Sequence, residues 1–110
     1  MEVSATAKYV RMSPRRCRAI AREVSGLRIE EALAMLAFMP NRAAEAITKV
    51  VKSAVANAEN NYALDRGALH VSTITIDDGP SLRRFRAKAR GRAGLYRKRS
   101  GHITVVVEDR

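Results

Sequence analysis

Hydrophobic and polar residues alternate at the start of the chain, where Val3 and Ala5 are separated by a hydroxyl side chain. A period of two is typical of a β-strand with one buried face. We therefore predict a strand over residues 2–10. Two later stretches rich in β-branched residues, 68–76 and 102–107, predict two further strands.

The middle strand shows a change of phase. Leu69 and Val71 lie on one face of a regular strand, whereas Ile74 and Ile76 lie on the other. The alternation slips near residues 72–73. This slip predicts either a β-bulge or a change in which face of the strand is buried.

Apolar residues between the first two strands repeat every three or four positions, which predicts helices. The first helix begins with Ser13 as N-cap and Pro14 in the first helical position, and it ends at Gly26. A second helix is expected over 28–39, before a proline, and a third over 41–61. The sequence thus predicts an α+β fold, with three helices packed on a small three-stranded antiparallel sheet.

A long basic segment precedes the last strand. It holds nine basic residues and no acidic ones between Arg83 and Arg99, and its basic residues occupy alternate positions over 84–92. Such a period suits an extended ribbon, because on a helix the charges would be scattered around the axis. We predict a protruding β-hairpin over about residues 81–99 that projects roughly 30 Å, with a solvated or disordered segment as the alternative.

The pairing within this hairpin can be estimated from its turn. A two-residue turn at 90–91 would place Phe85 opposite Tyr96 and, further down, Ile76 opposite Val105. This register aligns aromatic with aromatic and aliphatic with aliphatic residues, which favours one long hairpin. The two aromatic side chains could stack on nucleobases or on each other.

A chain of 110 residues suits a single domain. We expect a globular body, at about 1–80 and 100–110, from which the arm at about 81–99 extends. The lone cysteine, Cys17, has no partner for a disulfide or a metal site and is expected to be a small buried side chain.

The net charge of the chain indicates which class of partner it binds. The chain carries 21 Lys and Arg against 11 Asp and Glu, a net charge of +10, so nucleic acid is the first candidate partner. The sequence shows no apolar run long enough for a bilayer and no signal peptide, so we expect a cytoplasmic protein without membrane contact.

Catalysis is not expected. His70 and His102 are isolated, and no nucleophile or carboxylate stands at motif spacing to either. The neighbouring carboxylates Asp77 and Asp78 precede Gly-Pro and are interpreted as part of a turn. We therefore expect no enzyme activity, no metal and no cofactor.

The first helix offers a second basic surface. Arg15 and Arg16 lie in its first turn, where the helix dipole favours negative charge, so a bound phosphate would resolve the conflict. Ordinary surface charge is the alternative explanation. The expected surface consists of Lys8, Arg11, Ser13, Arg15, Arg16, Arg18 and Arg22.

Several motifs together give the chain a family resemblance over essentially its whole length. It resembles the bacterial large-subunit ribosomal protein twenty-two family. The stretches that carry the resemblance are Ser-Pro-Arg-Arg at 13–16, Ser-Ala-Val-Ala-Asn-Ala-Glu-Asn at 53–60, Asp-Asp-Gly-Pro-Ser at 77–81, Ala-Arg-Gly-Arg-Ala at 89–93 and Lys-Arg-Ser-Gly-His-Ile-Thr-Val-Val-Val at 98–107.

The resemblance implies a structural constituent of the large ribosomal subunit that binds 23S ribosomal RNA, contacts other ribosomal proteins and supports assembly, with no homo-oligomer expected. It also implies that the arm lines the nascent-peptide exit tunnel with a tip formed by Lys88, Ala89, Arg90, Gly91 and Arg92. The arm residues expected to bind RNA are Arg83, Arg84, Arg86, Lys88, Arg90, Arg92, Arg97, Lys98 and Arg99.

Two other classes of protein are alternatives to a ribosomal protein. An architectural DNA-binding protein also uses basic β-ribbon arms, but such arms carry an apolar wedge at the tip, whereas this tip is Arg-Gly. An RNA-modifying enzyme would need a cofactor loop or a catalytic cluster, and the sequence offers neither. Co-sedimentation with large ribosomal subunits after a high-salt wash would separate the three.

Overall fold

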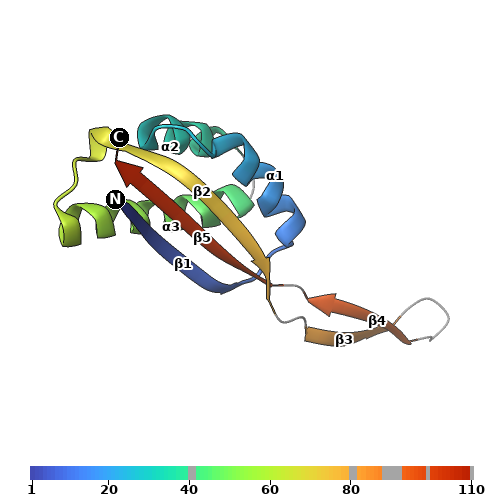
Figure 1. The fold of residues 1–110 in the computed structure, drawn as a ribbon. Helices are drawn as coiled ribbons and strands as arrows, with labels where there is room; N and C mark the ends of the chain where they lie inside the picture. Colours follow the sequence, from blue (N-terminus) through green and yellow to red (C-terminus); the bar gives the residue numbers. More distant parts are fainter. Residues whose placement is uncertain (40–41, 80–81, 88–92, 99, 110) are drawn as a thin grey trace.

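The computed structural model describes residues 1–39, 42–79, 82–87, 93–98 and 100–109, and for 82–87 and 93–98 it describes the backbone. Figure 1 shows a body of helices and strands with a two-stranded arm at one end. The elements are β1 (Glu2–Val10), α1 (Pro14–Val24), α2 (Ile29–Phe38), α3 (Arg42–Tyr62), the short 3-10 helix η1 (Arg66–Ala68), β2 (Leu69–Asp78), β3 (Leu82–Ala87), β4 (Ala93–Lys98) and β5 (Gly101–Asp109).

The body contains an antiparallel sheet of three strands in the order β1-β5-β2. The last strand of the chain is therefore the central one. Its alternate residues Ile103, Val105 and Val107 are fully buried, as expected of a strand with one face on the core. The predicted α+β fold, with three helices and a small antiparallel sheet, is confirmed.

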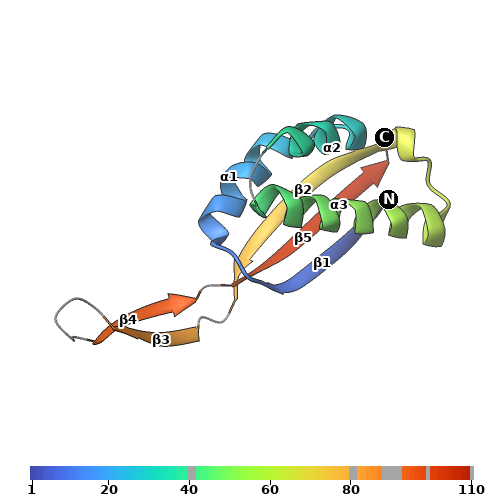
Figure 2. The same cartoon turned by 180° about the vertical axis from the view of Figure 1, so that it is seen from behind.

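Helices cover one face of this sheet, and Figures 1 and 2 show the same arrangement from opposite sides. Contacts join α3 to β1 and β5, α1 to β2, and α2 to α3. Because α3 crosses behind two strands, its inward residues are buried at helical spacing. Ile47, Val51 and Ala58 are fully shielded from solvent and anchor the core.

The helix boundaries agree with those expected from sequence. Ser13 occupies the N-cap position of α1 with extended backbone, although its side chain makes no capping hydrogen bond. Gly26 follows the helix with a φ of 86°, a conformation that only glycine adopts at little cost. In α2, Ile29, Ala32 and Leu36 are buried, and Leu33 is half-buried.

The phase change in β2 is a register shift against β5 between Val71 and Thr73, which confirms the predicted irregularity. The shift lets Val71 and Ile76 both face the core, where each is buried. Ile76 lies opposite Ile103 rather than Val105, so the predicted register is wrong for the body.

The end of β2 differs from its sequence interpretation. Asp77 and Asp78 were expected in a turn, but they pair with His102 and Gly101 as the last residues of the strand. Turn chemistry at Asp-Asp-Gly is outweighed here by continued backbone pairing with β5.

The arm consists of β3 and β4, which pair antiparallel as a separate two-stranded sheet. Phe85 lies opposite Leu95, and Tyr96 lies opposite Arg84, so the predicted pairing of the two aromatic residues is also wrong. Three residues separate β2 from β3 but two separate β4 from β5, and this difference of one residue offsets the register of the arm from that of the body. The predicted turn at 90–91 lies outside the described residues.

The arm gives the molecule an elongated shape. Its principal extents are 60 × 25 × 17 Å. In Figure 1 the arm leaves the body where β2 ends and β5 begins, close to the start of α1 and the end of β1. Both basic regions expected from sequence, the arm and the start of α1, are therefore found at one end of the body. The chain termini lie at the opposite end of the sheet.

Candidate RNA interface

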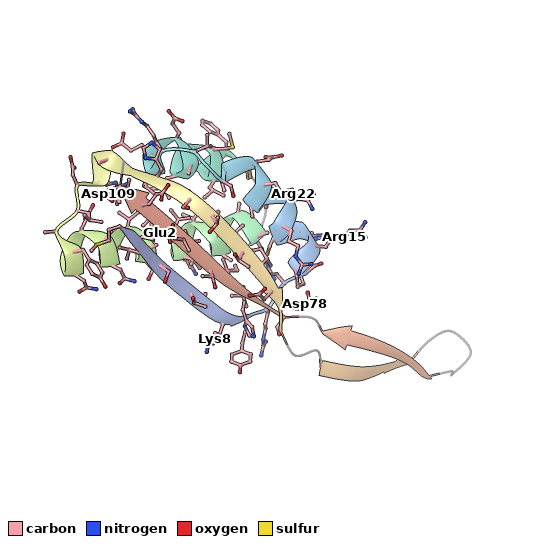
Figure 3. The ribbon with its side chains drawn as sticks, viewed as in Figure 1. Glu2, Lys8, Arg15, Arg22, Asp78 and Asp109 are labelled. Carbon is pink, nitrogen blue, oxygen red and sulfur yellow. The ribbon has the colours of Figure 1, made fainter. Side chains whose placement is uncertain are left out.

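Helix α1 separates apolar from basic residues. Its inward side contributes Cys17, Ile20 and Val24 to the core, each at most 7% exposed. Its other side carries exposed arginines in successive turns, and Figure 3 shows Arg15 and Arg22 directed away from the sheet. Helical spacing predicts a basic stripe of Arg15, Arg18 and Arg22, and all three are exposed, as is Arg16 beside them.

A hollow on one side of α1 brings together Arg11, Arg16 and Arg42. Arg11 precedes the helix, Arg16 lies in its first turn, and Arg42 starts α3. Ser13 also lines this hollow. Three guanidinium groups around one concave surface can bind a phosphate group by charge and by directed N–H donors.

Arg42 was not among the residues expected from sequence. In the sequence it looks like an ordinary residue near a helix start, 26 positions after Arg16. Its place beside α1 follows from packing between α1 and α3. No local pattern in the sequence reports such a neighbour.

A second hollow on the other side of α1 is lined by Arg15, Arg18 and Arg22, together with Asp78 of β2. Arg18 is partly engaged within the protein. Its Nε and Nη2 atoms donate to the carbonyl oxygen of Ile76 at 3.1 and 2.9 Å, and Nη2 lies 3.4 Å from a carboxylate oxygen of Asp78. Arg18 thus ties α1 to the end of β2, at the root of the arm.

The first turn of α1 lacks an acidic residue. Arg15 and Arg16 therefore face the positive end of the helix dipole, as the sequence indicated. The Ser13 side chain does not cap the helix, which leaves backbone N–H groups of the first turn to another acceptor. The arrangement favours an anion at this end of α1.

Lys8 and the arm complete the basic end of the molecule. Lys8 is exposed near the end of β1, and Figure 3 places it beside the root of the arm. In the arm, Arg83 lies opposite Arg97 in the register, and Arg84 and Arg86 follow in the same strand. Of the other arm residues expected to bind RNA, Lys98 ends β4, whereas Lys88, Arg90, Arg92 and Arg99 lie outside the described residues, as does the tip 88–92.

Acidic residues gather at the far end of the sheet, where Figure 3 shows Glu2 and Asp109. Met1 and Asp109 form an ion pair there at 3.0 Å, which lowers the pKa of the Asp109 carboxyl through a hydrogen bond and charge attraction. Glu2 and Asp109 thus lie at the end of the sheet remote from the arm, whereas the hollow with Arg15, Arg18 and Arg22 lies at the end that carries it and includes one carboxylate, Asp78.

The described residues offer nothing that resembles a catalytic centre. Among them, no group of three or more His, Cys, Asp or Glu side chains could hold a metal ion. His70 is bonded to the Ala68 carbonyl oxygen within its own strand region, and His102 accepts from the backbone of Tyr9. Burial raises the pKa of the Cys17 thiol, which makes it a poor nucleophile. No helix in the described part of the chain is long and apolar enough to cross a membrane.

Comparison with known proteins adds an independent finding. The family model described as "Ribosomal protein L22p/L17e" matches residues 5–108. The large ribosomal subunit protein uL22 of Desulforamulus reducens is 52% identical over 110 residues, which cover all of this chain and 97% of that protein. The proteins of the same name from Clostridioides difficile and a Thermotoga species are each 51% identical over the whole chain, covering 99% and 69% of their own lengths. The chain therefore belongs to the ribosomal protein L22p/L17e family and is a structural ribosomal protein rather than an enzyme.

Proposed function

We propose that this chain, a structural constituent of the large ribosomal subunit, binds 23S ribosomal RNA through two basic surfaces and supports assembly of the subunit beside other ribosomal proteins. The body, at about 1–80 and 100–110, would act as one domain and anchor the protein. The arm, at about 81–99, would reach between RNA segments, with residues 88–92 lining the nascent-peptide exit tunnel.

The observation that carries this proposal is the placement of two basic elements at one end of the molecule. Helix α1 and the arm meet where β2 ends, whereas Glu2 and Asp109 lie at the opposite end of the sheet. A folded RNA presents phosphates on several neighbouring segments, and a protein with charge on two elements can neutralise more than one of them. Charge along both elements also explains the net charge of +10.

The geometry of the arm supports an insertion role. Six residues in each of β3 and β4 form paired backbone, so this part of the arm is a ribbon of two strands. A ribbon of this width is narrow enough to enter a gap between nucleic acid helices. Its charges repel one another in the free protein, and RNA phosphates would remove that repulsion.

The anchoring part of the proposal is tested by binding to a 23S ribosomal RNA fragment at several salt concentrations. If about six to ten phosphates are neutralised, affinity falls by several powers of ten between about 50 and 200 mM salt. Replacing Arg15 and Arg16 with Ala is expected to reduce the slope of log affinity against log salt by about 1.4 to 1.8, since each phosphate contact contributes about 0.7 to 0.9.

A matched control removes two arginines from the other end of the body. Arg28 and Arg66 are both exposed. Arg28 bridges to His70 near the start of β2 and Arg66 starts η1, which directly precedes β2, so both lie at the opposite end of that strand from the arm. The Arg28→Ala, Arg66→Ala variant should keep the parent slope. Equal slopes for the two double variants, or a parent affinity that hardly depends on salt, would contradict the proposed interface.

The tunnel part is tested separately. A photo-crosslinking residue in place of Arg90 should react with a nascent chain stalled on ribosomes that contain the variant. The same residue in place of Arg66 should not. Absence of the crosslink at position 90, in subunits with full occupancy of the protein, would refute the tunnel role while leaving RNA binding untouched.

A further inference from the structure

An exposed aromatic side chain stands inside the basic end of the body. Tyr9 lies in the last part of β1, between Lys8 and Arg11, and is 64% exposed. Its ring is not among the side chains that form or pack against the core. Hydrophobic burial within the chain therefore does not explain a tyrosine at this position.

The backbone at Tyr9 adopts an unusual conformation. Its φ is 58°, in the left-handed region that side chains other than glycine and asparagine rarely occupy. The residue interrupts the pairing of β1 with β5, where the register shifts between Ala7 and Val10. Such a conformation costs on the order of 1 kcal/mol or more and persists only when its surroundings hold it. An outlier of this kind marks a residue whose orientation matters.

His102 holds this conformation in two ways. Its Nδ1 atom accepts a hydrogen bond from the backbone N–H of Tyr9 at 3.1 Å. Its ring also meets the Tyr9 ring edge to face, with centroids 5.1 Å apart and an interplanar angle of 90°. This geometry is the favourable one for two aromatic rings. The tyrosine is therefore oriented by a neighbouring strand and still presents most of its surface to a partner.

The surroundings indicate the chemistry of that partner. Lys8 and Arg11 are exposed on either side of Tyr9 in sequence, and Figure 3 places Lys8 at the root of the arm. Cations beside a fixed aromatic ring match a nucleotide, in which a flat apolar base is attached to a phosphate. An acidic protein partner would contact the cations by charge alone and would not need a fixed aromatic ring. Recognition of unpaired RNA bases, in contrast, uses aromatic side chains together with cations.

We propose that Tyr9 stacks on an unpaired nucleobase of ribosomal RNA and that His102 is the residue that positions it. The inference rests on the proposed RNA-binding function and adds to it a base contact outside both the arm and helix α1. Charge contacts would supply most of the binding free energy. Stacking by Tyr9 would add a contribution that does not depend on counterion release and therefore not on salt concentration.

The test measures binding of the full chain to a 23S ribosomal RNA fragment as a function of salt. Tyr9→Asn removes the ring and keeps a residue that tolerates positive φ. It should weaken binding by roughly 5- to 150-fold at every salt concentration, because stacking on one base contributes that much. The slope against salt should equal that of the parent. Tyr9→Phe retains the ring and should bind within about 2-fold of the parent.

Two further variants separate stacking from other effects. Tyr62, 52% exposed at the end of α3, is a matched control, and Tyr62→Asn should bind as the parent does. His102→Phe keeps a ring beside Tyr9 but removes the Nδ1 acceptor. It should weaken binding in the parent and have no further effect in the Tyr9→Asn background, as expected for two residues that act through one contact.

Each outcome decides the matter. If the parent binds with a steep salt dependence but Tyr9→Asn binds equally well, the stacking proposal is wrong and the proposed function stands. If Tyr9→Asn changes the salt slope, the contact is electrostatic and stacking is again wrong. If the parent itself fails to bind the RNA, the proposed function fails. Unfolding curves of all variants would identify any that lose the fold. If Tyr9→Asn is one of them, the binding of Tyr9→Phe and His102→Phe still tests the stacking proposal.

Discussion

Arg18 permits a quantitative test because the structure gives it an internal role. Its guanidinium group donates through Nε and Nη2 to one carbonyl oxygen, that of Ile76, and approaches Asp78 at 3.4 Å. A hydrogen bond from a charged donor contributes about 1.5 to 3 kcal/mol in a protected site. The Arg18 side chain is 44% exposed and that of Asp78 is 76% exposed, so the lower value applies, and the ion pair adds at most about 0.5 kcal/mol.

The variant Arg18→Ala should therefore lower the free energy of unfolding of the free protein by about 1.5 to 2 kcal/mol. For a chain of this size that loss lowers the melting temperature by roughly 6 to 16 °C. Urea denaturation followed by circular dichroism measures the free energy directly. Arg18→Lys can restore one donor to the Ile76 carbonyl oxygen and should recover about half of the loss.

Arg22 on the next turn of α1 is the control. It is exposed, and the described residues show no hydrogen bond or ion pair from it. Arg22→Ala should change the free energy of unfolding by less than about 0.5 kcal/mol. If Arg18→Ala is as stable as the parent, or if both variants lose the same amount, the contact to Ile76 does not tie α1 to the root of the arm.

Two further predictions concern the arm and the core. Deleting residues 88–92 should leave the free energy of unfolding within about 0.5 kcal/mol of the parent, because the core residues lie in the body. Urea denaturation and occupancy in purified large subunits would check this. An unfolded body would contradict it. Cys17 should resist a thiol reagent in the folded protein and react in urea, because burial raises its pKa. The folded state binds the thiol proton more tightly, so the stabilisation from this group is present below the ordinary thiol pKa of about 8.5 and declines as pH rises above it, a decline that should be smaller in Cys17→Ala.

Local patterns in the sequence predicted the elements well. Alternation at Val3 and Ala5 and helical spacing at Ile47 and Val51 report which side of a segment is apolar, and the core imposes that side in the fold. The slip in β2 was visible because the extra residue changes the phase of burial. These properties depend on neighbours in sequence, and a single sequence records them.

Pairing between distant segments was predicted less well. The register of β2 with β5 depends on how many residues join the body to the arm on each side, and a difference of one residue moves every pair beyond it. Asp77 and Asp78 carry turn chemistry, yet the partner strand continues beside them. Arg42 entered the candidate site through helix packing. None of these features has a signal within a window of adjacent residues.

The same limit applies to individual site residues. Arg18 looked like one of several surface arginines, and only its distance to the Ile76 carbonyl oxygen reveals an internal bond. Tyr9 looked like one position of an alternating strand, and its positive φ and its bond to His102 depend on a residue 93 positions away. The sequence shows which residues are charged, but it does not show which of them make contacts within the protein.

The central position of β5 has a consequence for synthesis of the protein. Strands β1 and β2 both pair with β5 and not with each other, so neither has a partner in this sheet until residues 101–109 have been synthesised. A chain that stops before residue 101 has its basic residues up to that point but lacks the central strand, and so has no three-stranded sheet on which its helices can pack. Such a fragment can attract RNA by charge without presenting the arm and α1 in a fixed relation. The fixed relation between α1 and the arm therefore depends on β5, a strand that is synthesised after both of them.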